Sequence, residues 1–197
     1  MRGAIGQVSA FLLTTYGEVT ILQTVEKQAM KITLDLPEKV LSELERKAKA
    51  ENTSVEGLIA DALAAFLDDP EAEEEMHLKL SEKYLREAEE FLSNGDLVQA
   101  SEKGWGAASQ AVKAAAARRG IRLGSHGELH RFVSELAKGE EGIRRLWQSA
   151  GMLHQNFYEN WLPEDMVAGN IGDVRELVMR LVSPRSPSAE LGDEAER

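Results

Sequence analysis

Two histidines carry side chains that could move a proton. His126 follows Arg119 with six residues between them, and His154 stands in the string LHQNFYENW. Imidazole titrates near neutral pH and a guanidinium binds phosphate oxygens through paired N–H donors, so an arginine and a histidine together suit phosphodiester cleavage. His154 has Ser149 five residues before it, and the next arginine upstream is Arg145, with eight residues between. The candidate catalytic residues are therefore His154, or the pair Arg119 and His126.

Structural roles could explain the same histidines. His154 could be a packed side chain bonded to a carboxylate, His126 could only mark a helix start, and His77, which stands among glutamates, is expected to be solvated. His126 and His130 share a helix face, but a third ligand would be needed to complete a metal site. We therefore predict no metal ion and no cofactor.

A second group of side chains could bind an anion. Residues 113–131 contain five basic residues and one acidic residue, Glu128, a local charge of +4 in a chain whose formal net charge is −11. The helix start expected at Ser125 adds free backbone amides that favour an anion. The alternative is a solvated helix end offset by acidic neighbours. The predicted anion-binding or nucleic-acid-binding residues are Lys113, Arg118, Arg119, Arg122 and Arg131.

The composition sets limits on the class of protein. Of 197 residues, 43% are hydrophobic and 29% are charged, which is typical of a globular protein with a real core. The sequence contains no run of 18 apolar residues, so it predicts no membrane-spanning helix. The chain has no cysteine, which suits a reducing compartment, so we expect a cytoplasmic protein. The acidic balance argues against a surface that coats nucleic acid, and any such site must be local.

Residues 31–67 should form one strand and two helices. Polar and apolar residues alternate over residues 31–36, the period of a strand with one buried face. Pro37 suits the first turn of a helix. A capping box predicts a second helix, with Thr53 accepting an amide and Glu56 reaching back. The apolar stripes are Val40, Leu41, Leu44 and Ala48 in the first helix, and Val55, Leu58, Ile59, Ala62, Leu63, Phe66 and Leu67 in the second.

This first module is too small to be stable alone. About 40 residues bury too little apolar surface, and a single strand leaves its hydrogen-bonding groups unpaired. Two copies could solve both problems by pairing their strands and packing four helices beneath. The segment KITLDLPEKVLSELERKAKAENTSVEGLIADALAAFL resembles ribbon-helix-helix repressors and antitoxins along its whole length. The chain is therefore expected to be a homodimer or a higher even oligomer.

The ribbon-helix-helix resemblance implies a DNA contact. In that family the outward strand side chains enter the major groove and the start of the second helix meets a phosphate. The residues in those places are Lys31, Thr33 and Asp35 on the strand, and Thr53 and Ser54 at the helix start. Lysine and threonine suit base or phosphate contact. Residues 31–67 nevertheless carry five basic and seven acidic residues, so a dimerisation module without DNA binding is the alternative.

Residues 74–182 should form a bundle of helices. After an acidic linker at residues 68–75, helical periods recur at 84–92, 96–117, 125–136, 143–157 and 174–181. Ser93-Asn94-Gly95 and Gly120 separate the first three, and Asp96 and Ser125 are placed to cap the second and third. The second of these helices is rich in alanine and glycine around Trp105, which lets neighbouring helices approach closely. Short connections favour an up-and-down bundle.

The strings ASEKGWGAASQAVKAAAARRG and LHQNFYENWLPEDMV resemble the archaeal PaREP family. PaREP bundles are in turn similar to the HEPN superfamily, many of whose members are metal-independent ribonucleases of toxin–antitoxin and defence systems. That resemblance implies a dimer with an arginine and a histidine in a shared cleft, with four to six residues between them in the sequence. His154 is the counterpart of the histidine by position, but Ser149 stands where the arginine is expected. Little or no ribonuclease activity is therefore predicted.

The sequence thus predicts a mainly α protein. We expect an extension at residues 1–29 that is disordered or lies upstream of the natural start, a ribbon-helix-helix-like module at 30–68, a HEPN-like bundle at 74–182 and a disordered tail at 183–197. The favoured function is a non-catalytic, dimeric, regulatory or antitoxin-like protein that binds DNA, RNA or a protein partner, away from membranes. The alternatives are a HEPN-type endoribonuclease and a bundle that binds a nucleotide or another small ligand.

Overall fold

The computed structural model describes residues 14–15, 18–19, 35–51 and 53–182, and the chain divides into two units at residue 37. In the first unit, β1 (Thr14–Thr15) and β2 (Glu18–Val19) pair antiparallel. The predicted strand at 31–36 lies outside the described residues except for Asp35 and Leu36, which belong to no helix or strand. Lys31, Thr33, the tail at 183–197 and most of the extension at 1–29 also lie outside them. The predictions made for these residues therefore stay predictions.

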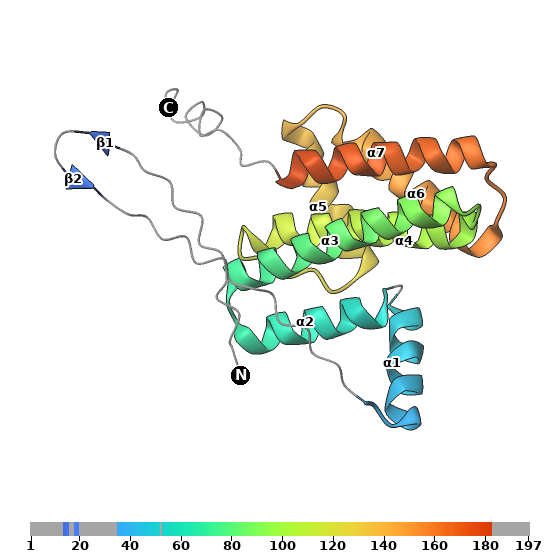
Figure 1. The fold of residues 1–197 in the computed structure, drawn as a ribbon, viewed down its shortest axis with the longest axis horizontal. Helices are drawn as coiled ribbons and strands as arrows, with labels where there is room; N and C mark the ends of the chain where they lie inside the picture. Colours follow the sequence, from blue (N-terminus) through green and yellow to red (C-terminus); the bar gives the residue numbers. More distant parts are fainter. Residues whose placement is uncertain (1–13, 16–17, 20–34, 52, 183–197) are drawn as a thin grey trace, which may run out of the picture. The chain divides into compact units, whose positions relative to one another are not determined.

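The second unit contains seven helices in its described part, which confirms the mainly α prediction (Figure 1). No described helix is both long and apolar enough to cross a membrane. In chain order the helices are α1 (Glu38–Ala50), α2 (Val55–Leu67), α3 (Pro70–Ser93), α4 (Leu97–Ala117), α5 (His126–Gly139), α6 (Ile143–Glu159) and α7 (Glu164–Val182).

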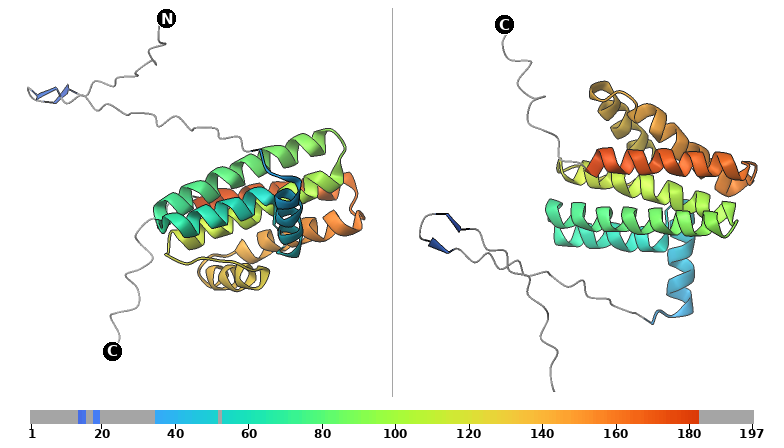
Figure 2. Two further views of the ribbon diagram at one scale, coloured as in Figure 1. Left: turned by 90° about the horizontal axis from the view of Figure 1, so that it is seen from below. Right: turned by 45° about the horizontal axis from the view of Figure 1, so that its top comes forward.

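Four helices form the main bundle, and α4 is its central member. α4 packs against α3, α6 and α7, and both α3 and α6 also pack against α7. The small residues of α4 permit this close approach, since Ala107, Ala108 and Ala111 are completely buried. α5 packs against α4 and α6 at the edge of the bundle (Figure 2). The expected up-and-down order therefore needs one correction: α4 meets α6 directly, and α5 lies outside the four main helices.

Capping residues determine where several helices begin. The predicted cap at Asp96 is confirmed, because its carboxylate accepts a hydrogen bond from the Gln99 amide at 3.0 Å. The predicted cap at Ser125 is also confirmed, with its hydroxyl accepting from the Glu128 amide at 3.4 Å. Glu128 reaches back to the amide of Gly124 at 2.8 Å, and this bond lowers the pKa of its carboxyl.

Two predictions about helix starts are wrong. The cap of α2 is Ser54 rather than Thr53, and the Ser54 hydroxyl accepts from the Gly57 amide at 2.9 Å. The acidic stretch at 68–75 is not a linker, because α3 already begins at Pro70, with Asp69 as its cap. A proline at the first helical position loses no helical hydrogen bond, so Pro70 starts α3 as well as ending α2.

The helix pair α1–α2 is joined to the bundle through α2. Gly57, Ala60 and Ala64 are buried, so α2 comes close to its neighbours. Three ion pairs strengthen the contact: Glu56–Lys83 at 2.5 Å, Asp61–Lys113 at 2.5 Å and Asp68–Arg122 at 2.9 Å. α1 runs across the end of α2 and buries only Ala48 (Figure 1).

Candidate functional site

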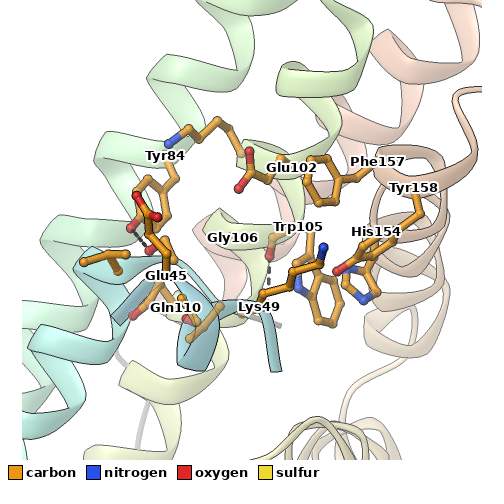
Figure 3. A pocket seen from close by; sticks show the side chains of 16 residues that line it. Glu45, Lys49, Tyr84, Glu102, Trp105, Gly106, Gln110, His154, Phe157 and Tyr158 are labelled. Carbon is orange, nitrogen blue, oxygen red and sulfur yellow. Dashed lines mark hydrogen bonds between the residues drawn. The ribbon is translucent and has the colours of Figure 1, made fainter. Parts of the chain in front are cut away.

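A cavity of about 560 Å³ lies between the α1–α2 connection and the bundle (Figure 3). Its walls come from α1, from the start of α2, and from α3, α4 and α6. Cavities of roughly 300–1,000 Å³ commonly bind small molecules in proteins. The cavity is therefore large enough for a ligand such as a nucleoside.

Aromatic side chains form the wall that α4 and α6 contribute. Trp105 and His154 stack with ring centroids 4.5 Å apart and planes inclined by 30°. Tyr158 meets the His154 ring edge-on at 5.4 Å, and Phe157 lies beside Tyr158. Residues 154, 157 and 158 share a face of α6 because they are three and four positions apart. We call Trp105, His154, Phe157 and Tyr158 the aromatic wall.

His154 is an uncharged member of this wall. Burial, together with the neighbouring His126 and His130, lowers the pKa of His154 to about 4. At pH 7 the ring is therefore neutral, and it cannot act as a general acid. An uncharged ring stacks with a neutral planar group without electrostatic penalty.

Tyr84 on α3 forms the opposite side of the cavity. Its hydroxyl lies 2.5 Å from the hydroxyl of Ser54, so the cap of α2 is also tied to the bundle. Burial raises the pKa of Tyr84, and its phenol stays protonated. A Cβ at Gly106 would lie 3.0 Å from the Tyr84 ring, so the glycine leaves room for that ring against α4.

Polar groups surround the aromatic wall. Glu45 and Lys49 from α1 and Glu102 from α4 line the cavity, and none of the three forms an ion pair within the part of the chain that the structure describes. Lys103 is already engaged, because its Nζ lies 3.0 Å from a Glu87 oxygen. The cavity therefore offers two carboxylates and one ammonium group to a ligand.

Comparison with known proteins identifies the bundle. The model of the archaeal PaREP1/PaREP8 family matches residues 76–178, slightly more than half of the chain. The chain belongs to the PaREP1/PaREP8 family. A crystal structure of a protein from Sulfolobus solfataricus is 37% identical, with a TM-score of 0.49; the match covers 52% of this chain and 93% of that one. No curated protein matches the sequence.

The aromatic wall lies inside the region that the PaREP1/PaREP8 model matches. Tyr84 and Glu102 lie in it too, whereas Glu45, Lys49 and Ser54 lie before it. The cavity of this PaREP1/PaREP8 protein thus combines a wall from the family's bundle with a cover from the α1–α2 segment.

The structure brings two of the predicted catalytic residues together. His126 lies with its ring centroid 4.9 Å from that of His154, and both contact Trp105. His130 accepts a hydrogen bond from the Trp147 indole at 2.8 Å. Among the described residues, no group of three or more histidine, aspartate or glutamate side chains is arranged to hold a metal ion.

The candidate arginines are engaged elsewhere. The guanidinium of Arg119 lies 5.5 Å from the centre of the Phe132 ring. Arg145 donates to Asp173 on α7 at 2.9 Å, and Ser149 donates to the same carboxylate at 2.6 Å. Both residues upstream of His154 therefore join α6 to α7. Arg119 thus lies against Phe132 and Arg145 is paired with Asp173, and the catalytic assignment of His154, or of Arg119 with His126, stays a prediction.

Three members of the predicted anion-binding group make ion pairs inside the protein. Lys113 is buried and lies 2.5 Å from Asp61, Arg118 lies 2.5 Å from Glu74, and Arg122 bonds Glu73 and Asp68. These pairs hold α2 and α3 to α4 and to the segment after it. All four arginines of the group are exposed, and only Lys113 is buried. The carboxylates reduce the charge that this group can offer to a phosphate.

Two polar residues have structural roles, and sequence reasoning misread one of them. His77 is buried rather than solvated, and its Nδ1 donates to Gln110 at 2.7 Å. Burial lowers its pKa. Asn156 fixes the turn between α6 and α7: its oxygen accepts from the amides of Trp161 and Leu162, and its nitrogen donates to Ser101. Glu73 and His77 are four positions apart and so share a helix face, and this spacing was the signal in the sequence that could have indicated the structural role of His77.

Proposed function

We propose that this PaREP1/PaREP8 protein binds a small planar ligand of the nucleobase type in the cavity, without catalysing a reaction. The observation that supports this most strongly is the aromatic wall, which places the stacked rings of Trp105 and His154 beside a space of about 560 Å³. Stacking of a base on an aromatic side chain contributes roughly 1–3 kcal/mol. Of the three functions that the sequence left open, this is the last: a bundle that binds a nucleotide or another small ligand.

The polar residues support a heteroaromatic ligand rather than a hydrocarbon. A nucleobase carries N–H donors at its edge, and Glu45 and Glu102 are acceptors without an ion-pair partner in the described chain. Lys49 can meet a carbonyl oxygen or an anionic substituent. The charge of these three side chains sums to −1, so a neutral nucleoside should bind better than its triphosphate.

The test is calorimetric titration of the whole protein with guanosine and with adenosine, and with ribose as a control. Tyr158→Ala should weaken nucleoside binding by at least about fivefold, because an aromatic surface is lost. Trp161→Ala is the matched control, since Trp161 is a half-exposed aromatic residue that does not line the cavity. Absence of binding by both nucleosides at millimolar concentration would refute the proposal, as would equal losses in the two variants.

A metal-independent endoribonuclease is the second candidate function. The observation in its favour is the contact between His126 and His154, since two neighbouring imidazoles can divide base and acid roles. Against it, Arg145 and Ser149 both donate to Asp173, so the Arg145 guanidinium is engaged by a carboxylate of α7. Cleavage of RNA in the presence of a chelator, lost in both His154→Ala and His126→Ala, would establish the enzyme and overturn the non-catalytic proposal.

The regulatory or antitoxin-like role implied by the first module remains a separate proposal. It depends on a strand at 31–36 and on Lys31 and Thr33, most of which lie outside the described residues. Gel-shift titration with DNA and with RNA, comparing the parent with Lys31→Glu, would test it. Binding that is unchanged by this substitution would exclude the strand as the reading surface.

A further inference from the structure

Glu102 is the carboxylate that α4 itself places beside the aromatic wall. It stands three positions before Trp105, so the two side chains lie on the same side of the helix. Both line the cavity, together with the rings of His154 and Phe157 (Figure 3). A planar ligand that lies against the aromatic wall therefore has its edge near the Glu102 carboxylate.

The Glu102 carboxylate is available to accept hydrogen bonds from a ligand. It forms no ion pair among the described residues, and its neighbour Lys103 does not neutralise it, because the Lys103 ammonium lies 3.0 Å from Glu87. The Glu102 side chain is half-buried, whereas Glu45, the other carboxylate of the cavity, is exposed on α1. Hydrogen bonds are stronger where water is partly excluded, so Glu102 is the better acceptor of the two.

The chemistry of a carboxylate favours one base over the others. Its two oxygens only accept, so it pairs best with two adjacent N–H donors. Guanine carries such a pair on one edge, the N1–H and the 2-amino group. In adenine and cytosine the amino group stands next to a ring nitrogen whose lone pair would face a carboxylate oxygen. Uracil has a single N–H between two carbonyl groups.

Lys49 adds a second preference of the same kind. Its ammonium lines the cavity, forms no ion pair in the part of the chain that the structure describes, and only donates hydrogen bonds. Guanine has a carbonyl oxygen at position 6, beside its N1–H, whereas adenine has an amino group there, which an ammonium cannot serve. The cavity thus offers an acceptor-only and a donor-only group, and guanine complements both.

We propose that the cavity selects guanine over the other bases, with Glu102 accepting from the N1–H and the 2-amino group and Lys49 donating to the carbonyl at position 6. This inference rests on the proposed function, because it specifies the ligand of the same cavity. Glu102 is its specificity-determining residue. A site that holds hydrogen-bonding groups for one ligand discriminates strongly against an analogue that leaves them unpaired.

The experiment is calorimetric titration of the full chain with guanosine, inosine and adenosine. Inosine is guanosine without the 2-amino group, so it removes one donor and changes little else. The parent should bind guanosine at least about fivefold more tightly than inosine, and at least about twentyfold more tightly than adenosine.

One substitution tests the role of Glu102 directly. In Glu102→Gln the amide offers one acceptor and one donor, which suits the amino group and ring nitrogen of adenine, so the preference for guanosine over adenosine should fall to about threefold or less. Glu82→Gln is the matched control, since Glu82 is an exposed glutamate on α3 that does not line the cavity. This variant loses the same charge and should keep the preference of the parent.

The outcomes separate this inference from the proposed function. Equal affinities of the parent for guanosine, inosine and adenosine would overturn guanine selection and leave nucleoside binding intact. A Glu102→Gln variant that melts like the parent and keeps its full preference would overturn the role of Glu102. Binding of none of the three nucleosides at millimolar concentration would overturn both proposals. The comparison with inosine needs no substitution, so it decides the question even if Glu102→Gln does not fold.

Discussion

Protonation of His154 should destabilise the protein, and the effect can be isolated with one substitution. Burial and the neighbouring His126 and His130 lower its pKa from 6.5 to about 4. The unfolded chain therefore binds this proton more tightly than the folded chain does. Stability from a neutral His154 should be fully present above pH 6.5 and should fall as the pH drops toward 4.

The magnitude follows from the two pKa values. For a fully shielded ring, the loss between pH 7 and pH 5 is about 2 kcal/mol. Solvent reaches part of the His154 side chain, so we expect about 1 kcal/mol after allowing for that screening. For a chain of this length, this corresponds to a change of roughly 2–4 °C in the melting temperature.

The assay compares the melting temperatures of the parent and His154→Phe at pH 7 and at pH 5. Phenylalanine keeps an aromatic ring against Trp105 but does not titrate. The two proteins differ only at residue 154, so the contributions of all other ionisable groups largely cancel in the comparison. The parent should lose more stability than the variant on acidification. An equal loss in the two proteins would show that His154 is not held neutral by its surroundings.

Three further substitutions, two of them with a matched control variant, test the packing by urea unfolding. Asp61→Ala should reduce the free energy of unfolding by about 2–3 kcal/mol because it leaves the buried Lys113 ammonium without its partner. Lys79→Ala, which breaks an exposed pair, should cost less than about 0.5 kcal/mol, and similar losses for the two would contradict this reasoning. Gly104→Ala should cost about 1–2 kcal/mol, because a Cβ there would lie 2.6 Å from Leu153, whereas Gly151→Ala has open space and should stabilise α6 by up to about 1 kcal/mol. Asn156→Ala should cost roughly 2–3 kcal/mol, because the amides of Trp161 and Leu162, the second of them buried, lose their acceptor, and a loss below about 0.5 kcal/mol would be evidence against that role.

Local patterns predicted the helices well. Apolar residues that recur every three or four positions predicted the helices of the second unit. The caps at Asp96 and Ser125 were predicted correctly from residue type alone. The start of α2 was placed one residue too early because Thr53 and Ser54 are both good caps. Only the path of the backbone decides which of them reaches an amide. Likewise, a proline after two aspartates ends one helix or starts another, and at Pro70 it does both.

The candidate site was harder to predict, because it depends on contacts between distant segments. Trp105 and His154 were noticed separately, but nothing in the sequence places a residue of α4 against one of α6. The basic group at 113–131 looked available to a phosphate because its partners Asp61, Glu73 and Glu74 are about 40 to 50 residues away in the chain. The role of α2 was also ambiguous. Its large apolar residues dominate the pattern, yet its small residues make the contact with the bundle.

The most direct test of the binding proposal uses the three tryptophans. Each indole N–H gives one resonance in a ¹H–¹⁵N spectrum, and of Trp105, Trp147 and Trp161 only Trp105 lines the cavity. Titration with guanosine should shift the Trp105 resonance most. Trp147, which contacts Trp105 at 5.1 Å, should shift less, and Trp161 should not move. A titration that shifts Trp161 alone, or that leaves Trp105 unmoved at millimolar guanosine, would contradict a ligand stacked on the aromatic wall.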